Sequence, residues 1–326
     1  MRDIDLSIII VNWNTKELLK DCLDSLYRRD MAISSEVIIV DNNSTDGSKE
    51  MVANVFPMAR LIKNNSNEGF ARANNRALRE VNGRYALLLN SDTIVPDVGI
   101  FGKWISFMDG HPEAGASGCR LVLKNGNHWF GDAGYKPDLA SIINFSFFLV
   151  KINPRLFRGV YINYTLKVAR KDLQLPFEVD WIGGAAFLVR SSILPHTGLL
   201  SEETFMYAED IEWGCRIRSS GYRIYYLPCI EIIHLVGGSG KRDNNSSAYS
   251  VSWLKNLRLL YRQYNKSQPA AVFNVIFGTG LILRVFLYYL LYLKGKKQED
   301  LEKAKELRFY AKYLFKNEKA SYAHRN

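Results

Sequence analysis

Short polar side chains follow three apolar runs in the first hundred residues, and each group begins where its run ends. The groups are Asn12-Trp13-Asn14, Asp41-Asn42-Asn43-Ser44 and Asn90-Ser91-Asp92. A carboxylate in such a group can accept a hydrogen bond from a pyrimidine N–H, or hold a divalent cation that bridges two phosphates. The alternative is that each group is a turn or a helix cap, because Asn, Asp and Ser favour both.

A pair of adjacent carboxylates, Glu209-Asp210, begins a segment with helical character. Adjacent side chains on a helix point about 100° apart, so the two carboxylates cannot act as one symmetric pair. One of them is suited to remove a proton as a general base while the other orients a neighbour or faces solvent. The alternative is that both stabilise the positive end of the helix dipole, and the two roles are compatible.

The elements that must position these groups alternate between buried strands and amphipathic helices. Continuous apolar runs at 6–11, 37–40 and 85–89 predict strands buried on both faces, and leucines at helical spacing follow the first run. This alternation predicts an α/β fold with a mostly parallel sheet. Ligands of such sheets bind beyond the carboxyl ends of the strands, so we expect the three polar groups to lie at one edge.

Later segments are less regular. Asn67–Asn75 contains Gly69 and opens a predicted helix over Phe70–Val81, and a helix N-terminus with Arg72 nearby suits diphosphate oxygens, although an ordinary loop entry fits too. The pattern predicts one strand over Trp181–Val189, a helix over Glu209–Ser219 and a strand over Tyr222–Leu227. Residues 139–164 are aromatic without periodicity.

Taken together, residues 6–240 resemble the nucleotide-sugar glycosyltransferases of family two, which have the Rossmann-like GT-A fold. The resemblance is densest in Val11–Asn14, Asp41–Ser48, Asn67–Asn75, Asn90–Thr93 and Glu209-Asp210. Within the family the rhamnosyltransferase-like branch matches best. Its pattern is similar to Leu89–Thr93, to Trp181-Ile182-Gly183-Gly184-Ala185 and to His234-Leu235-Val236-Gly237-Gly238-Ser239.

The resemblance implies a role for each position on the donor side. Asp41 would recognise the base, and Asn12 and Asn14 would line the nucleotide pocket. The floor under ribose and diphosphate would be formed by Asn67, Gly69 and Phe70. The remaining donor-side residues of these segments are Asn43, Asn74 and Ser91.

The resemblance also implies a metal site and a catalytic base. Asp92 and His234 would hold Mg²⁺ or Mn²⁺, although Asn90 replaces the first aspartate of the family's Asp-x-Asp motif. Asp210 would be the base of an inverting displacement, supported by Glu209. On the acceptor side, Trp181 would offer a stacking face, and Gly183 and Gly184 would permit close approach. A bulge at the glycines and core packing of Trp181 are the alternatives.

The charge separates the chain into two parts. The whole chain has a net charge of +10, but residues 1–240 carry 26 basic and 27 acidic residues, a net of −1. Residues 241–326 carry 17 and 6, a net of +11. We therefore predict a GT-A domain over 1–240 and a basic helical tail over 241–326. The four cysteines form no C-x-x-C pair, which argues against zinc ribbons and disulfide scaffolds.

The tail contains an apolar segment suited to a membrane. Residues 270–293 are apolar except for Asn274 and Arg284, and as a helix they reach about 36 Å, enough to cross a bilayer. A central arginine costs about 2.5–3.5 kcal/mol there. Basic clusters flank both ends, so an in-plane or re-entrant arrangement keeps both at the anionic cytoplasmic face. The alternative is a helical oligomerisation element, which leaves a homo-oligomer open.

These features predict a glycosyltransferase of cell-surface polysaccharide synthesis at the cytoplasmic face of the membrane. It would move a deoxyhexose, with rhamnose from dTDP-rhamnose as first choice, to a saccharide acceptor carried on polyprenyl diphosphate. The alternatives are a UDP-hexose-dependent enzyme of the same fold and a non-catalytic membrane-associated nucleotide-binding module. A dinucleotide oxidoreductase is disfavoured because no G-x-G-x-x-G follows the first strand, and a nucleic-acid partner because the basic residues accompany an apolar helix.

Overall fold

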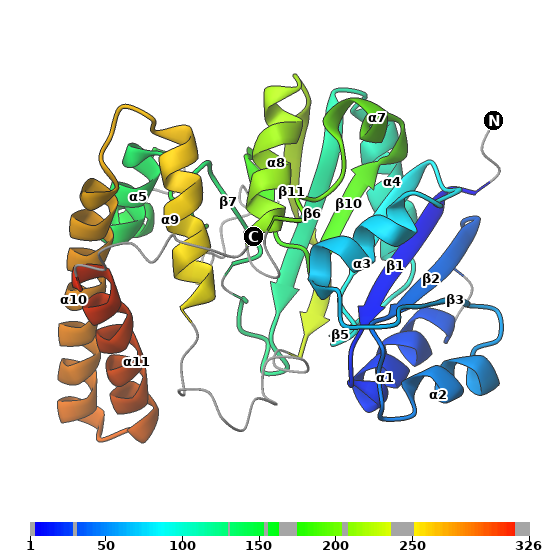
Figure 1. The fold of residues 1–326 in the computed structure, drawn as a ribbon, viewed down its shortest axis with the longest axis horizontal. Coiled ribbons are helices and arrows are strands. Elements are labelled where there is room, and N and C mark those ends of the chain that lie inside the picture. The colour runs from blue at the N-terminus through cyan, green and yellow to red at the C-terminus, as the bar shows by residue number, and fades with distance from the viewer. Residues whose placement is uncertain are drawn as a thin grey trace. The chain divides into compact units, whose positions relative to one another are not determined.

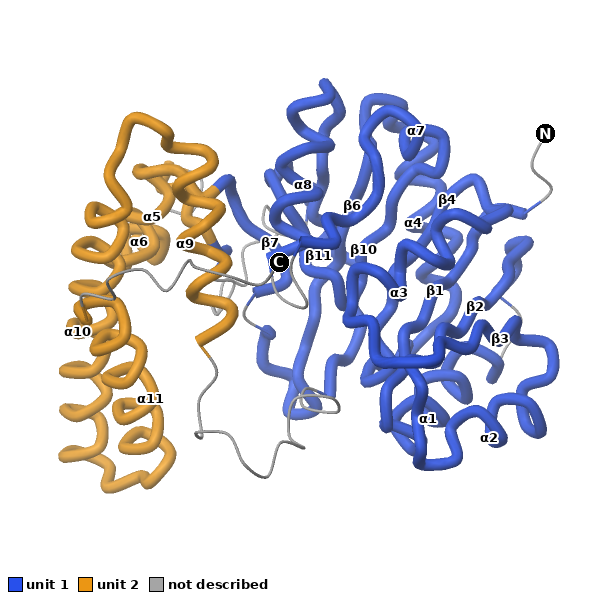
Figure 2. Tube along the Cα trace, viewed as in Figure 1, with its two compact units in different colours: residues 1–136, 161–244 blue, residues 137–160, 245–326 orange. Residues whose placement is uncertain are grey.

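The computed structural model describes residues 4–28, 31–129, 131–152, 156–162, 175–203, 208–235 and 251–316. The chain forms two compact units (Figure 2). Unit 1 contains residues 1–136 and 161–244, and unit 2 contains residues 137–160 and 245–326. The predicted domain boundary between residues 240 and 241 lies outside the described residues and stays a prediction.

Unit 1 is built on a mixed, mostly parallel sheet (Figure 1). Its strands run in the order β3-β2-β1-β4-β10-β6-β11-β5, and β8 pairs with β11. Their bounds are β1 Leu6–Asn12, β2 Ser35–Asp41, β3 Arg60–Lys63, β4 Tyr85–Leu89, β5 Thr93–Ile94, β6 Ala114–Val122, β8 Phe177–Val179, β10 Ala186–Arg190 and β11 Arg223–His234. A small second sheet pairs β7 (Ala133–Gly134) with β9 (Trp181–Ile182). The predicted α/β fold class is confirmed.

Helices cover both faces of this sheet because successive residues of a strand point to opposite sides. One buried cluster joins Ile8 and Ile10 of β1 to α1 (Lys16–Tyr27), α2 (Ser48–Val55) and α4 (Ile100–Gly110). The other joins Ile9 to α3 (Gly69–Leu78), α7 (Leu194–Thr197) and α8 (Glu209–Ser219). The continuous apolar runs of the sequence therefore mark strands buried on both faces, as predicted.

Three predicted elements have different bounds in the structure. The strand predicted over Trp181–Val189 is two strands, β9 and β10, because the chain turns at residues 183–185. The strand predicted over Tyr222–Leu227 continues as β11 to His234, with irregular pairing to β6 after Leu227. The helix predicted to begin at Phe70 begins at Gly69 and ends at Leu78.

Unit 2 consists of helices, two of which lie in the aromatic segment without periodicity. The helices are α5 Leu139–Ser146, α6 Leu149–Ile152, α9 Ser252–Tyr264, α10 Ala270–Gly295 and α11 Gln298–Phe315. Helix α5 begins at Asp138, whose carboxylate accepts a hydrogen bond of 2.8 Å from the Ser141 N–H. The segment 137–160 therefore interrupts unit 1 in the sequence and belongs to unit 2, together with the C-terminal helices.

Arg284, the one charged residue inside the apolar segment, turns toward α5. Its guanidinium donates to the carbonyls of Ser146 at 2.8 Å and Phe145 at 2.5 Å. It also lies over the rings of Phe145 and Phe148, 4.6 and 4.2 Å from their centroids. Burial lowers its pKa to about 10, which leaves it charged at neutral pH. The arginine thus holds α10 to the segment inserted from the middle of the chain.

Helix α10 is, within the described part of the chain, the one helix long and apolar enough to cross a membrane. Its most apolar window has a mean hydropathy of 2.0, and 28% of that window is buried inside the protein. This helix is therefore not the covered core helix of a soluble domain. Length and composition alone do not distinguish a crossing helix from one lying on the membrane.

Replacing Arg284 by Met should loosen unit 2, because hydrogen bonds of a charged donor to buried carbonyls stabilise by about 1.5–3 kcal/mol. We expect faster amide hydrogen exchange in α5 and α10, measured by mass spectrometry, with the sheet of unit 1 unchanged. Leu283→Met on the exposed side of α10 is the matched control and should leave both helices as protected as before. Unchanged exchange in α5 of Arg284→Met would contradict this role.

Candidate active site

Three predicted site segments meet at one edge of the sheet. Strands β1, β2 and β4 are neighbours and parallel, with Asn12 opposite Asp41 in the register. Their carboxyl ends therefore bring Asn12, Asp41 and Ser91 to the same side, as the strand pattern predicts. That these residues bind a nucleotide stays a prediction.

Buried hydrogen bonds connect the three strand ends. The Asn12 amide donates to Asp41 Oδ2 at 2.9 Å and to Ser44 Oγ at 3.1 Å, and Asn12 Oδ1 accepts from Thr15 Oγ1 at 2.6 Å. Thr15 Oγ1 lies 3.0 Å from Ser91 Oγ. Asp41 is fully buried, and its other oxygen accepts from the Ser44 N–H at 2.7 Å. Asp41 thus fixes the positions of Asn12 and Ser44. Its direct contact with the base of a nucleotide stays a prediction.

Asn14 and Asn43 hold the loop after β2 in its shape. Both adopt left-handed backbone angles, with φ of 53° and 63°, which Asn tolerates better than most residues. Asn14 Oδ1 accepts from the Thr45 N–H at 2.8 Å, and the Asn14 N–H donates to Ser44 Oγ at 2.9 Å. The Asn43 side chain is exposed at this edge.

A second polar chain runs from β3 to the start of α3. Asn64 donates to Asn42 Oδ1 at 2.7 Å, and Asn42 donates to the Gly69 carbonyl at 3.2 Å and to Asn67 Oδ1 at 3.3 Å. Asn67 Oδ1 also accepts from the Gly69 N–H at 3.0 Å, and Gly69 has a φ of 80° that favours glycine. Asn74, predicted on the donor side, is buried and donates to the Phe70 carbonyl within α3.

Sequence reasoning missed Asn42 and Asn64. Both are buried at 4% exposure or less, and their hydrogen bonds hold the end of β3 and the start of α3 to the loop after β2. The available signal was their position: Asn42 follows Asp41 directly, and Asn64 follows the last residue of β3.

The two predicted metal ligands lie side by side although 142 positions separate them in the chain. Strand β5 pairs antiparallel with the end of β11, placing Thr93 opposite His234. As a result His234 Nε2 lies 3.2 Å from Asp92 Oδ1, and both residues are buried. His234 Nδ1 is also buried and has no hydrogen-bond partner among the described residues. Residues 236–239 of the predicted motif lie outside the described residues.

This pair fits a divalent cation of the kind the fold family implies. The carboxylate and the imidazole are both common metal-binding groups, and their separation of 3.2 Å would allow both to contact one ion. In the described part of the chain, no group of three or more His, Cys, Asp and Glu side chains gathers at one point. Mg²⁺-type sites commonly use one or two protein ligands and complete their shell with phosphate oxygens and water.

Asp210 is half-buried at the start of α8, and both of its oxygens accept backbone hydrogen bonds. Oδ2 accepts from the Gly184 N–H at 3.0 Å and Oδ1 from the Ile211 N–H at 2.8 Å. Burial raises the pKa of this carboxyl, and the backbone hydrogen bonds partly oppose that shift. A carboxylate with increased proton affinity and a fixed orientation is suited to act as a general base. Glu209 beside it is 5% exposed.

Gly184 lies between Phe70 and Asp210. A Cβ added there would lie 2.8 Å from the Phe70 ring, so the absent side chain leaves room for that ring. Gly183 is similarly close to the chain before β7, and its N–H donates to the Asp132 carbonyl at 2.8 Å. The turn therefore places Phe70 of α3 and Asp210 of α8 against one residue, Gly184.

Trp181 does not present the stacking face predicted for it. It is 1% exposed, its indole N–H donates to the Tyr135 carbonyl at 3.2 Å, and the Tyr161 ring packs against it edge-on. The core-packing alternative describes its position. Burial and the negative charge of Asp210 both raise the pKa of the Tyr161 hydroxyl, so Tyr161 is an aromatic residue that interacts with Asp210.

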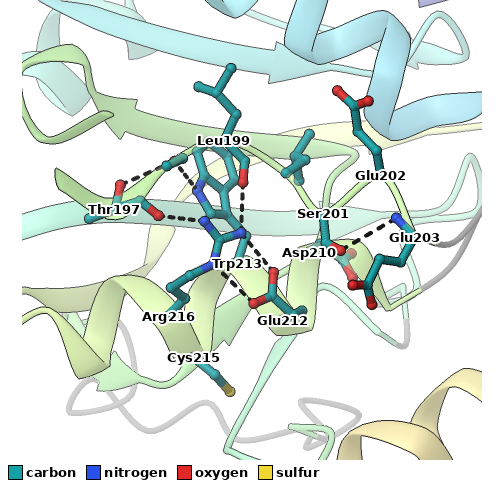
Figure 3. A network of polar contacts seen from close by, with 12 residues as sticks. Thr197, Leu199, Ser201, Glu202, Glu203, Asp210, Glu212, Trp213, Cys215 and Arg216 are labelled. Carbon is teal, nitrogen blue, oxygen red and sulfur yellow. Dashed lines mark hydrogen bonds and ion pairs between the residues drawn. The ribbon is translucent and has the colours of Figure 1, made fainter. Parts of the chain in front are cut away.

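The loop before α8 is held by side chains of that helix (Figure 3) and by Asn75 of α3. Arg216 forms an ion pair with Glu212 at 2.7 Å and donates to the carbonyls of Thr197 and Leu199. Trp213 donates to the Gly198 carbonyl at 2.9 Å. On the other side, Asn75 exchanges hydrogen bonds with the backbone of Leu200. Residues 204–207, which lead directly into Asp210, lie outside the described residues.

A buried His128–Asp132–Tyr226 cluster also escaped sequence reasoning. Asp132 Oδ2 accepts from the Tyr226 hydroxyl at 2.6 Å and lies 2.8 Å from His128 Nε2. The next residue to His128, Trp129, packs edge-on against the His234 ring at 5.2 Å. Trp129 thus lies against His234, and Asp132 is hydrogen-bonded to Gly183 of the glycine turn. Sequence spacing alone carries little signal for a pairing with Tyr226 on a distant strand.

The chain resembles known glycosyltransferases in sequence and structure. Residues 7–160 match the family model described as glycosyl transferase family 2. An N-acetylglucosaminyl-diphospho-decaprenol L-rhamnosyltransferase of Mycobacterium tuberculosis is 26% identical over 64% of this chain and 68% of its own length. The low-salt glycan biosynthesis hexosyltransferase Agl10 of Haloferax volcanii is 25% identical over 71% of this chain and 67% of its own length.

Two solved structures share the fold. The mannosyltransferase PcManGT from Pyrobaculum calidifontis, in complex with GDP-Man and Mn²⁺, has a TM-score of 0.59 and 18% identity over 95% of this chain and 85% of its own. GalNAc-T7 with UDP, GalNAc and Mn²⁺ has a TM-score of 0.58 and 15% identity, and the match covers 81% of this chain and 49% of GalNAc-T7. The sheet with its flanking helices is therefore a GT-A fold, as predicted.

Replacing Gly184 by Ala should displace the Phe70 ring and weaken nucleotide binding while the protein still folds, because overpacking of this kind costs about 1–3 kcal/mol. Calorimetric titration with dTDP and UDP measures the effect. Gly102→Ala is the matched control, because a Cβ there meets its nearest atom at 4.0 Å. Affinity equal to that of the control would contradict the close approach of Phe70.

Asp92→Asn and His234→Ala should each weaken Mn²⁺ binding in the presence of a nucleoside diphosphate by at least about tenfold, because each removes one of two protein ligands. Electron paramagnetic resonance of free Mn²⁺ measures this directly. His196→Ala, which removes an exposed histidine of α7, is the control and should bind as the natural chain does. Equal affinity in all three variants would place the metal elsewhere.

Proposed function

Because residues 7–160 match the family 2 model and a mycobacterial rhamnosyltransferase is 26% identical, we propose that this chain is a rhamnosyltransferase-like member of glycosyltransferase family 2. It would transfer rhamnose from dTDP-rhamnose to a saccharide acceptor carried on polyprenyl diphosphate. The name of the mycobacterial relative supports both the sugar and a lipid-linked acceptor. A second relative, named O-antigen biosynthesis protein RfbC, supports a role in cell-surface polysaccharide synthesis. The single observation that carries a catalytic role is Asp210, a carboxylate with raised pKa fixed by the Gly184 N–H.

The base acts in a single displacement that inverts the anomeric carbon. The acceptor hydroxyl oxygen forms the new bond to that carbon while its proton passes to an oxygen of Asp210. The bond from the carbon to the diphosphate breaks, and its electron pair leaves on the diphosphate oxygen. Each Asp210 oxygen accepts one backbone hydrogen bond, and a carboxylate oxygen keeps a second lone pair for the incoming proton.

The donor is held at the edge formed by β1, β2 and β4. Asn14, Asn43 and the loop after Asp41 surround the nucleotide's pyrimidine ring. The start of α3, at Gly69 and Phe70, lies under the ribose and diphosphate. Asp92 and His234 would hold Mg²⁺ or Mn²⁺ there. When bound, the cation supplies positive charge against the negative charge that grows on the departing diphosphate.

Membrane attachment through the tail is a further part of the proposal. A polyprenyl-linked acceptor stays in the bilayer, so an enzyme that uses it gains from residence at the cytoplasmic face. The apolar helix α10 and the basic residues on either side of it support this location. In this view unit 2 carries the enzyme to its acceptor, and unit 1 carries the chemistry.

A UDP-hexose donor is the second candidate. A poly(ribitol-phosphate) beta-glucosyltransferase of Bacillus spizizenii is 32% identical over 31% of this chain, which favours a hexose in the same pocket. A panel of nucleotide sugars with the purified full chain and Mn²⁺, followed for release of nucleoside diphosphate, distinguishes the candidates. Preferred turnover of dTDP-rhamnose supports the first, preferred turnover of a UDP-hexose supports the second, and no turnover of any donor supports a non-catalytic module.

Asp210→Asn should reduce transfer by about 10²–10⁴-fold while dTDP binding persists, because the amide cannot take the proton. The natural chain should lose activity as pH falls through the pKa of Asp210. That acid limb lies above the ordinary value of 3.8, because burial raises this pKa. Asp24→Asn, an exposed aspartate of α1, is the control. Near-normal turnover of Asp210→Asn would overturn the assignment of the base.

A further inference from the structure

Helices α10 and α11 form a hairpin with two unlike outer sides. Helix α11 runs back along α10 (Figure 1), and its buried side chains face inward: Ala304, Leu307, Tyr310, Ala311 and Leu314. Near the far end of the hairpin the Phe315 ring lies against Gly278, where a Cβ would be only 2.6 Å from it. The two helices are therefore packed together from Gly278 to the turn at Lys296.

The free side of α10 is apolar. Its exposed large side chains are Val275, Ile282, Leu283, Phe286, Leu287, Leu290, Leu291 and Leu293. Several of them are more than half exposed, including Phe286 at 60% and Leu293 at 60%. Large contiguous apolar surfaces of this kind mark sites that bind a partner or a membrane.

The free side of α11 is charged. Residues 298–315 contain eight charged side chains, and two pairs of them are bound to each other: Lys303 with Glu306 at 2.7 Å and Lys305 with Glu302 at 2.8 Å. These four side chains are between a quarter and half exposed, so they face water. The hairpin thus has an apolar side and a hydrated side along the same length.

This pairing is incompatible with α10 crossing a bilayer. If α10 crossed with α11 attached, the eight charges of α11 would lie at the depth of the hydrocarbon, where a charged residue costs about 2.5–3.5 kcal/mol at the centre. If α11 detached, its buried face and that of α10 would lose their contacts. A hairpin in the plane of the membrane keeps the charges of α11 in water and keeps the contacts between the two helices. An in-plane helix buries one face about 5–10 Å deep and leaves the other face in water.

The flanking charges favour lipid over a second copy of the chain. Helix α10 contains no Asp or Glu, and Lys294, Lys296 and Lys297 lie at its end. Helix α9 before it carries Lys255, Arg258 and Arg262. Two copies joined through α10 would bring basic ends against basic ends in either orientation. Anionic headgroups instead attract such residues by about 1 kcal/mol each.

We propose that the α10–α11 hairpin lies flat in the membrane surface, with α10 embedded among anionic lipids and α11 above it in water. This inference rests on the membrane attachment within the proposed function. It decides between the spanning and in-plane arrangements that the sequence leaves open. Arg284 points inward to α5 in this arrangement and does not enter the lipid.

Depth measurements on the full chain test this orientation. An environment-sensitive fluorophore is attached to Ile282→Cys, Phe286→Cys, Leu290→Cys or Leu293→Cys, one at a time, after Cys229, the one exposed cysteine of the described residues, is replaced by Ser. Vesicles of phosphatidylcholine with phosphatidylglycerol are added, and lipids brominated at different chain depths quench the probe. Lys305→Cys on the outer side of α11 is the matched control.

An in-plane hairpin gives one shallow depth for all four α10 positions, while the Lys305→Cys probe stays in water. A depth that changes steadily from Ile282 to Leu293 would mean that α10 crosses the bilayer, which overturns the inference but leaves membrane attachment standing. No vesicle binding would overturn both. A blue shift that depends on protein concentration without vesicles would identify a second copy as the occupant and overturn the lipid assignment.

Discussion

The hydrogen bond from the Gly184 N–H to Asp210 is the contact on which the rest of the site depends. It fixes the orientation of the Asp210 carboxylate, and the missing side chain at Gly184 admits the Phe70 ring on the other side. Gly183 ties the same turn to the Asp132 carbonyl and so to the segment that packs on His234. Elements from four distant parts of the chain therefore share one short turn, and a shift of that turn would move all of them together.

Around this turn, buried asparagine side chains hold the loops in shape. Asn12, Asn42 and Asn64 offer both donors and acceptors, so each connects two loops that would otherwise move independently. A buried polar side chain is stable only when its hydrogen bonds are made, which gives these loops one favoured arrangement. The edge of the sheet is thus held in one shape without a ligand, and such preorganisation limits the entropy that a ligand's binding would cost.

Much of this arrangement follows from the sequence, because buried parallel strands leave continuous apolar runs such as 37–40 and 85–89. The placement of Asn12, Asp41 and Ser91 at one edge follows from strand order alone. Trp181 could not be placed in this way, since a tryptophan beside glycines suits both a stacking face and a core. The pairing of His128 and Asp132 with Tyr226 depends on tertiary packing that leaves no periodic signal. Helix α5 has eight residues and α6 only four, and exposed apolar side chains such as Ile152 occur among them, so this segment shows no clear amphipathic pattern.

The division of unit 2 into two separate stretches of chain also orders events during synthesis. Arg284 and its acceptor Phe145 are 139 positions apart, so α5 leaves the ribosome long before the residue that holds it. Domains generally fold from the N-terminus during translation, and the described strands and helices of unit 1 end at His234. The sheet of unit 1 can therefore form while α9, α10 and α11 of unit 2 are still being made. Helix α5, although made early, reaches its packing partner only after the sheet is in place.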